Sequence, residues 1–339
     1  MVRRLLVPAA TIIVVALVVL DALAFLGWPD GGPIALAQVL AGHLTLLAVL
    51  IIPAAFLREA GLLRWALAVL ALLTILRFGG EWWSFPSGVG DDTARLDVMT
   101  WNLEMGARPP ADAVAFLRSG TARVVAMQEL TPDTAAAVAA DPVLAKRYPY
   151  QALYPSPDVL GLGLLSTDPL TDVRFDAGPS RLFATVTSPI GAVRVVEVHP
   201  LHGVIAQGPL GLPMSYDVAE RSAALGRISD AIAADDLGAS TLVLGDINTA
   251  PTEPEFGRFI ARLSAIDPHA LAPYRDAHAE VGLGPGWTYR PDALEPLGIG
   301  LLRIDVVLTG PGLHPVAETT RCPPAGDHCA VLATVVAGP

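Results

Sequence analysis

The chain has 339 residues, of which 53% are hydrophobic, and its 22 basic and 33 acidic residues give a formal net charge of −11. The first 90 residues are strongly apolar and hold five of the basic and four of the acidic residues, which leaves 17 and 29 for the rest of the chain. The acidity of this second part argues against nucleic acid as a partner, because tight binding to nucleic acid depends on a cationic surface. A polyanionic substrate would need a metal ion there.

Three hydrophobic runs divide residues 1–83, at about 5–28, 34–57 and 62–83. Each is close to the roughly 20 residues that a helix needs to cross a bilayer. The pattern predicts an all-α membrane region of three transmembrane helices. In the alternative interpretation, the first run is a cleaved signal peptide, since Ala22-Leu23-Ala24 resembles a cleavage site after a basic, apolar leader.

The arginines predict how this region is oriented. Arg3 and Arg4 precede the first run, Arg58 and Arg64 lie between the second run and the apolar stretch of the third, which starts at Trp65, and the first connection has only Asp30. By the positive-inside rule, the N-terminus and the second connection are cytoplasmic. We therefore expect a multi-pass protein of the plasma membrane whose large domain is extracytoplasmic, beside the lipid bilayer. A cleaved leader would leave the domain on the same side.

Three polar residues, Asp21, His43 and Arg77, interrupt the hydrophobic runs. Counted along straight helices at about 1.5 Å per residue, all three lie roughly 10 Å inside the outer boundary of the membrane. We expect them to form one polar cluster. It would act either as a hydrogen-bonding staple of the helix bundle or as a contact for a substrate headgroup.

Residues 84–95 are rich in Pro, Gly and Asp and predict a linker that tethers a domain of residues 96–337 near the outer bilayer surface. In that domain, β-rich apolar runs alternate with amphipathic or alanine-rich stretches. The predicted strands are 96–101, 124–127, 182–187, 193–198, 241–244, 304–309 and 331–336, and the predicted helices are 111–118, 131–140, 216–234 and 255–263. We expect an α/β fold, a two-sheet sandwich flanked by helices.

Polar residues follow several of these strands directly, where a two-sheet sandwich would gather them at one rim. The motifs are Trp101-Asn102-Leu103-Glu104, Gln128-Glu129, His199 after a strand, Gly245-Asp246-Ile247-Asn248, Asp305 in the strand that starts at Arg303-Ile304, and Gly326-Asp327-His328. In this order and at these spacings they resemble the endonuclease/exonuclease/phosphatase superfamily, over about residues 96–336. One departure is visible, because Gly326 stands where the superfamily usually has serine.

The resemblance implies a metal-dependent phosphoesterase. Glu129 would be the principal ligand of Mg²⁺, or of Mn²⁺ in its place, and Asn102 and Glu104 would complete that site. Asp327 would assist in binding a second metal ion. Glu104 has the alternative of being merely solvated. Oxygen ligands of this kind suit a hard divalent cation.

The resemblance also implies the catalytic residues. Asp305 would orient His328 against the phosphoryl group, Asp246 would orient or deprotonate the attacking water, and Asn248 and His199 would contact phosphate oxygens. His202 has the alternative of an ordinary loop residue, and Trp287-Thr288-Tyr289 could form core packing or a wall for the substrate.

The only two cysteines, Cys322 and Cys329, flank the Asp327-His328 loop. In an outward-facing domain we expect a disulfide that holds the histidine in place. A zinc site that includes His328, or two free thiols, are the alternatives.

Within the superfamily, the layout is similar to VanJ-type membrane proteins of actinobacteria, a group associated with teicoplanin resistance and with dephosphorylation of the undecaprenyl pyrophosphate carrier. This similarity implies a lipid-linked phosphate or pyrophosphate as substrate. Residues 201–214 lack any Asp, Glu, Lys or Arg and would suit contact with lipid, or form a plain crossover to the next helix. The alternatives are an extracytoplasmic phosphodiesterase or nuclease that acts on phospholipid or nucleic acid, and a non-catalytic, membrane-anchored binding protein.

Overall fold

The computed structural model describes residues 2–26, 31–85, 93–178, 180–235, 238, 240–267, 272–291, 294 and 297–338. The predicted end of the first span at Trp28, the first connection with Asp30 and most of the predicted linker lie outside these residues.

Two N-terminal helices, α1 (Val2–Leu26) and α4 (Gly61–Trp82), are long and apolar enough to cross a membrane. The predicted second span is not one straight helix. It consists of α2 (Gly32–Val39), α3 (Ala41–Leu47) and a 3-10 helix, η1 (Ala48–Phe56), and is bent by 64° after α2. Pro53 within η1 has no N–H to donate to a regular α-helical ladder. The described part of the chain thus contains two candidate spans, or three if the bent pair counts as one.

Only two members of the predicted polar cluster meet inside the helix bundle. Arg77 of α4 donates to the Asp21 carboxylate of α1 at 2.9 Å, and Thr74 faces the same carboxylate at 3.4 Å. His43 lies elsewhere, because the bend after α2 redirects α3. The imidazole stacks on Trp287 at 4.4 Å between ring centroids, so the prediction of a three-residue cluster was wrong for this residue.

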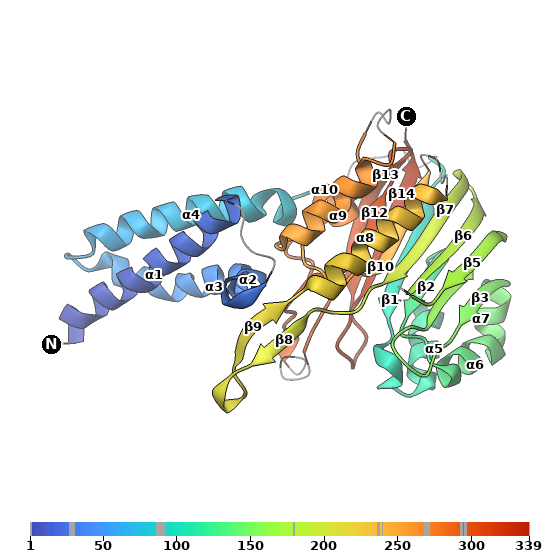
Figure 1. Cartoon of the computed structure of the whole chain (residues 1–339), viewed down its shortest axis with the longest axis horizontal. Helices are drawn as coiled ribbons and strands as arrows, with labels where there is room; N and C mark the ends of the chain where they lie inside the picture. Colours follow the sequence, from blue (N-terminus) through green and yellow to red (C-terminus); the bar gives the residue numbers. More distant parts are fainter. Residues whose placement is uncertain are drawn as a thin grey trace.

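The rest of the chain folds around two six-stranded mixed sheets (Figure 1). In spatial order, the first sheet contains β13 (Leu313–Arg321), β14 (Ala330–Ala337), β1 (Leu96–Asn102), β2 (Val124–Gln128), β4 (Leu162–Ser166) and β3 (Tyr150–Tyr154). The second sheet contains β11 (Arg275–Asp276), β12 (Asp305–Thr309), β10 (Thr241–Asp246), β7 (Gly191–His199), β6 (Ser180–Ser188) and β5 (Leu170–Asp176). A separate hairpin consists of β8 (Val204–Gln207) and β9 (Pro213–Asp217).

Helices cover the outer faces of the two sheets. They are α5 (Pro110–Ser119), α6 (Pro132–Ala140), α7 (Pro142–Arg147), α8 (Ala219–Ala234), α9 (Pro254–Ser264) and the short α10 (Ala277–Val281). Side chains cap α6 and α7: Thr131 accepts from the N–H of Thr134 at the start of α6, and Asp141 accepts from two N–H groups at the start of α7. Proline at the first turn of both helices costs no hydrogen bond.

Three apolar layers hold this architecture together. Leu96, Val98 and Leu244 belong to the layer between the sheets, Trp101 and Phe116 to the layer under α5–α7, and other residues, such as Ile228 and Phe259, to the layer under α8 and α9. The continuous apolar runs in the central strands are explained by this arrangement, because both faces of each sheet are covered.

The seven predicted strands and three of the four predicted helices are confirmed, within two residues at each end. The helix predicted from Tyr216 begins at Ala219, since Tyr216 belongs to strand β9. The charge-free segment 201–214 is a hairpin rather than a plain crossover.

Strand register brings the polar strand ends to one rim. In the parallel pair β1–β2, Asn102 lies beside Gln128, so Glu129 follows directly. In the antiparallel pair β10–β12, Asp246 lies opposite Asp305. His328 precedes β14, which runs antiparallel to β1.

The sandwich packs directly against the helix bundle. The N–H of Gly284 donates to the carbonyl of Trp82 at 2.8 Å, and Trp83 forms a bridge with Leu283. Arg303 reaches back to Glu81 of α4 at 3.0 Å. The helix bundle therefore lies close to the rim that carries the polar strand ends.

Candidate active site

The structure gathers the predicted catalytic and metal-binding residues at the rim formed by both sheets. Most of them are buried, and the group consists of Asn102, Glu104, Glu129, His199, Asp246, Asn248, Asp305, Asp327 and His328.

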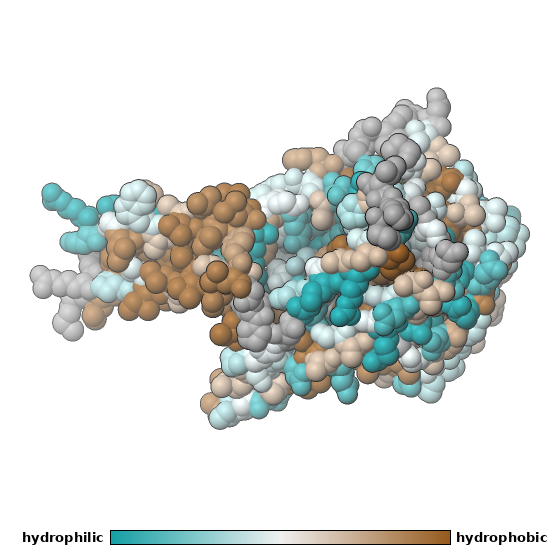
Figure 2. Space-filling model, turned by 45° about the horizontal axis from the view of Figure 1, so that its top comes forward, coloured by the Kyte–Doolittle hydropathy of each residue, from teal (hydrophilic) through white to brown (hydrophobic). Residues whose placement is uncertain are grey.

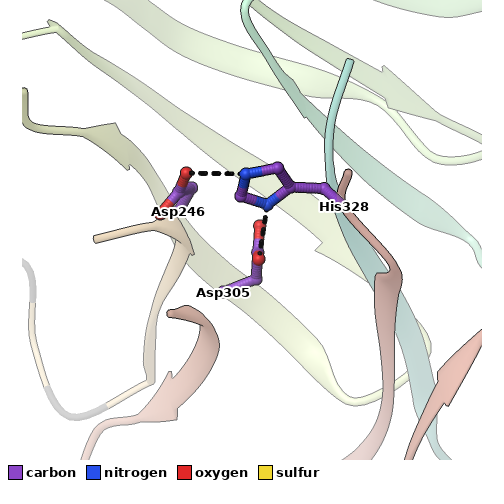
Figure 3. A group of neighbouring side chains, drawn as sticks. All are labelled: Asp246, Asp305 and His328. Atoms are coloured by element: carbon purple, nitrogen blue, oxygen red, sulfur yellow. Dashed lines mark hydrogen bonds and ion pairs between the residues drawn. The ribbon is translucent and has the colours of Figure 1, made fainter. Parts of the chain in front are cut away.

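His328 and Asp305 form a buried pair (Figure 3). Nδ1 of His328 donates to Asp305 at 2.9 Å. Burial opposes the imidazolium, but the carboxylates of Asp305, Asp246 and Asp327 outweigh it and raise the pKa of His328 to about 10. The hydroxyl of Thr288 accepts from the N–H of Asp305 at 3.1 Å and so fixes the strand that carries the carboxylate.

Asp246 occupies the centre of the group. One carboxylate oxygen lies 3.7 Å from Nε2 of His328 and 3.7 Å from Nε2 of His199, and accepts from Asn102 at 3.0 Å. Burial and the neighbouring Asp305 carboxylate raise the pKa of Asp246 to about 6. At neutral pH it is mostly ionised and able to accept a proton.

Asn248 and His199 lie on the far side of Asp246. The side chain of Asn248 donates to the carbonyl of Pro200 at 3.0 Å and lies 3.5 Å from Nε2 of His199. Nδ1 of His199 faces the carbonyl of Val159 at 2.9 Å, which leaves Nε2 directed into the site. Asn248 has a left-handed backbone conformation (φ 53°), as do Glu129 and Glu104, a sign of a constrained site.

Carboxylates at the other end of the group fit a hard divalent cation. Glu129 accepts from Asn102 at 3.0 Å, and Asp327 has a buried oxygen without a hydrogen-bond partner among the described residues. Burial, together with the Glu104 and Glu129 carboxylates, raises the pKa of Asp327 to about 6. This excess of negative charge and the orphaned oxygen are what a cation would compensate.

The carboxylate of Glu104 is not simply solvated. It pairs with Arg108 at 3.1 Å and accepts from the N–H of Asp327 at 3.2 Å. Asp246, Asp305 and His328 also lie close enough together to hold a metal ion. We favour the Glu129 end, because His328 and Asp305 already satisfy each other and a metal between them would displace that hydrogen bond.

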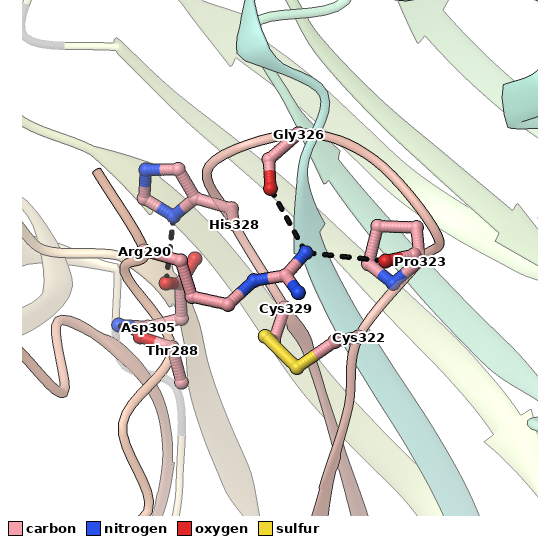
Figure 4. The surroundings of a disulfide bond; sticks show 8 residues. All are labelled: Thr288, Arg290, Asp305, Cys322, Pro323, Gly326, His328 and Cys329. Atoms are coloured by element: carbon pink, nitrogen blue, oxygen red, sulfur yellow. Dashed lines mark hydrogen bonds and ion pairs between the residues drawn. A yellow bond between two sulfur atoms is a disulfide. The ribbon is translucent and has the colours of Figure 1, made fainter. Parts of the chain in front are cut away.

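A disulfide between Cys322 and Cys329 closes the loop before His328 (Figure 4). Neither a zinc site with these cysteines nor free thiols are present. Arg290 braces the same loop by donating to the carbonyls of Pro323 at 3.1 Å and Gly326 at 2.9 Å. A side chain at Gly326 would overlap the guanidinium of Arg108, so the glycine in place of serine makes room for that arginine.

Sequence reasoning missed three residues that support the site: it assigned no role to Arg221 and Arg303, and it gave Thr288 only the alternatives of core packing or a substrate wall. Buried Arg221 donates to the carbonyl of Asn248 and pairs with Glu253 and Glu255. Thr288 supports Asp305, and Arg303 precedes that residue by two positions. For Arg303, the available signal was an arginine within an otherwise apolar run.

A pocket of about 370 Å³ opens over the group, and its walls are mainly apolar. Of the predicted catalytic residues, four line its floor together with Tyr289: His199, Asp246, Asn248 and His328. Apolar walls come from the hairpin, from Leu302 and Ile304, and from Leu36 and Val39 of helix α2. One cavity thus joins the carboxylate cluster to a helix of the apolar bundle.

Solved structures show the same fold at low sequence identity. The 3′-5′ exonuclease NExo of Neisseria meningitidis superposes with a TM-score of 0.53 at 18% identity, over 70% of this chain and 98% of that one. TDP2 of D. rerio gives 0.51 at 16% over 71% and 98%, and an AP endonuclease of Archaeoglobus fulgidus gives 0.51 at 16% over 70% and 98%. No curated protein matches the sequence significantly.

The sequence profile of the Endonuclease/Exonuclease/phosphatase family matches residues 99–328, which include every motif at the rim. Enzymes of this family hydrolyse phosphate esters with divalent metal ions, in keeping with the acidic cluster found here. The chain belongs to the endonuclease/exonuclease/phosphatase family.

Proposed function

We propose that the protein is a membrane-anchored phosphohydrolase that uses Mg²⁺ to hydrolyse a lipid-linked phosphate or pyrophosphate at the outer membrane surface. Undecaprenyl pyrophosphate is the preferred substrate, as for the VanJ-type proteins that the sequence resembles. The observation that carries this proposal is the shared pocket, in which helix α2 and the hairpin provide apolar walls above the catalytic carboxylates. A headgroup on that floor would leave its chain against apolar residues.

The proposed mechanism assigns one task to each group at the rim. A divalent cation held by Glu129 and Asn102, with Asp327 nearby, would neutralise charge on the phosphoryl oxygens. Asp246 orients the attacking water and accepts its proton. His328, kept cationic by Asp305, donates to a phosphoryl oxygen, while Asn248 and His199 hold the phosphate from the opposite side.

The test is phosphate release from undecaprenyl pyrophosphate by the full-length protein in detergent. We expect release that stops with a chelator and returns with Mg²⁺, and a decrease of about 100-fold or more for His328→Ala. His314→Ala is the matched control, because His314 lies opposite Val336 at the far end of strand β14 and should leave the rate unchanged.

Three results would contradict the proposal. Intact lipid with nicked plasmid DNA would make the protein a nuclease of the same family, and cleaved phospholipid would make it a phosphodiesterase. Tight binding of the lipid without any metal-dependent release would indicate a binding protein that has kept the fold.

A further inference from the structure

The β8–β9 hairpin exposes a group of large apolar side chains. It forms a two-stranded sheet apart from the two large ones. Its apolar side chains point outward, with exposed fractions of 97% for Leu210, 60% for Val204 and 58% for Leu212. No Asp, Glu, Lys or Arg occurs from Pro200 to Tyr216, although the domain as a whole is acidic.

The hairpin is joined to the apolar helix bundle. Tyr216 of β9 forms a bridge with Gly32 at the start of α2, and the phenol is anchored to the buried Arg221. In Figure 1, where the long axis of the molecule is horizontal, the hairpin extends from the sandwich downward and toward the bundle. Its tip lies below α2, at a similar position along that axis. Figure 2 shows that the surface of this bundle is strongly hydrophobic.

An isolated two-stranded hairpin is at best marginally stable in water, and this one carries its large apolar residues outside. Within the described part of the chain, nothing covers Leu210, Leu212 or Val204. Apolar residues without charge, placed beside helices that can span a membrane, fit one surrounding: the boundary of the lipid headgroups and acyl chains.

We propose that the β8–β9 hairpin inserts its tip into the outer leaflet and, with α2, forms a lip through which a lipid chain reaches the catalytic pocket. Ile205 and Tyr216 of the hairpin line that pocket together with Leu36 and Val39 of α2, so the lip and the floor belong to one cavity. The insertion rests on the proposed membrane embedding of the helices, but it does not depend on which headgroup is cleaved.

The chain offers a clean way to test insertion. Cys322 and Cys329 are joined in a disulfide, so a cysteine placed at position 210 is the only free thiol and can carry an environment-sensitive nitrobenzoxadiazole dye. The full-length Leu210→Cys protein would be reconstituted in vesicles of phosphatidylglycerol and phosphatidylcholine. Val173→Cys on edge strand β5, on the side of the sandwich away from the bundle in Figure 1, is the matched control.

We expect the label at position 210 to emit at shorter wavelength, to be quenched by doxyl lipids and to resist aqueous iodide, and the label at 173 to behave in the opposite way. Equal iodide quenching at both positions would overturn the proposal. Shielding from iodide without quenching by doxyl lipids would also overturn it, and would indicate that a second copy of the chain covers the hairpin.

A second variant separates this inference from the proposed function. Leu210→Asp should slow hydrolysis of a lipid pyrophosphate in vesicles at least 10-fold and leave hydrolysis of a water-soluble phosphate ester unchanged. If the label inserts but the wild-type protein releases no phosphate from the lipid, the proposed insertion is supported and the proposed substrate is wrong. If lipid hydrolysis is normal in Leu210→Asp, the lip has no part in access.

Discussion

Gly245 immediately precedes the Asp246 carboxylate at a point where no side chain fits. Its backbone is left-handed (φ 144°), and a Cβ there would overlap the carbonyl oxygen of Val198 on the neighbouring strand β7. Both strain and overlap oppose any larger residue, so we expect Gly245→Ala to destabilise the folded protein by about 3 kcal/mol. Thermal unfolding of the detergent-purified protein would measure this loss.

The matched control for that variant is Gly257→Ala. Gly257 lies within helix α9 in open space, where alanine favours the helix by about 0.5–1 kcal/mol. Equal melting temperatures for the two variants would show that the close approach of β10 and β7 is unimportant.

His278 is held between two acceptors in the segment that contacts the bundle. One ring nitrogen faces Glu318 at 2.7 Å and the other the carbonyl of Gly284 at 2.8 Å, so both are satisfied only in the imidazolium. Burial opposes this charge, but the hydrogen bond to Glu318 outweighs it and raises the pKa of His278. A raised pKa in the folded state means that the stabilisation is complete below about pH 6.5 and is lost as pH rises through the folded value.

We therefore expect the stability advantage of the wild type over His278→Gln to shrink as pH increases from 6 to 9. Thermal unfolding across this range would measure the difference, and His314→Gln serves as a control for loss of a partly buried histidine. A difference that stays constant with pH would mean that His278 is neutral in the folded protein.

At the scale of elements, helix α4 is linked to strand β12, which carries the predicted catalytic residue Asp305. Arg303 donates to Glu81 at the end of α4 and, through two nitrogens, to Asp276 of β11. All three side chains are mostly or fully buried, and Arg303 is two residues before Asp305. Helix α4 thereby helps to set the position of β12.

Removal of Glu81 should therefore affect catalysis without removing a group from the pocket floor. We expect Glu81→Ala to lower kcat about 10-fold with little change in KM, because the buried guanidinium of Arg303 loses one of its two carboxylate partners. Glu81→Gln keeps an acceptor and should recover most of the rate. Glu59→Ala, an exposed residue just before α4, should have no effect, and equal kcat values for Glu59→Ala and Glu81→Ala would exclude this coupling.

At the scale of the whole molecule, the two-sheet architecture was predictable because its central strands are continuous apolar runs of the right length. Seven of the described strands were missed: β3, β4, β5, β8, β9, β11 and β13. Edge and hairpin strands such as β5 and β9 carry exposed polar residues or Gly and Pro that also occur in loops. The position of His43 was not predictable by counting along a helix, because the 64° bend breaks the count.

The composition of the site was also predictable, since its motifs lie at strand ends that share one rim. Its supporting contacts were not, because Arg303 and Glu81 are 222 residues apart in sequence and only the fold brings them together. The same holds for Arg108, whose place against Gly326 depends on the path of the disulfide-closed loop.

Helix α2 contributes Leu36 and Val39 to the wall of the catalytic pocket, and this has a kinetic consequence. Under the proposed function, the site opens beside a membrane-embedded helix and encounters molecules confined to a plane, so its supply depends on how many substrate molecules share each unit of lipid area. Turnover should then follow the mole fraction of substrate in the bilayer. Extra inert lipid would slow the enzyme by dilution in two dimensions, even when the amount of substrate per volume is unchanged.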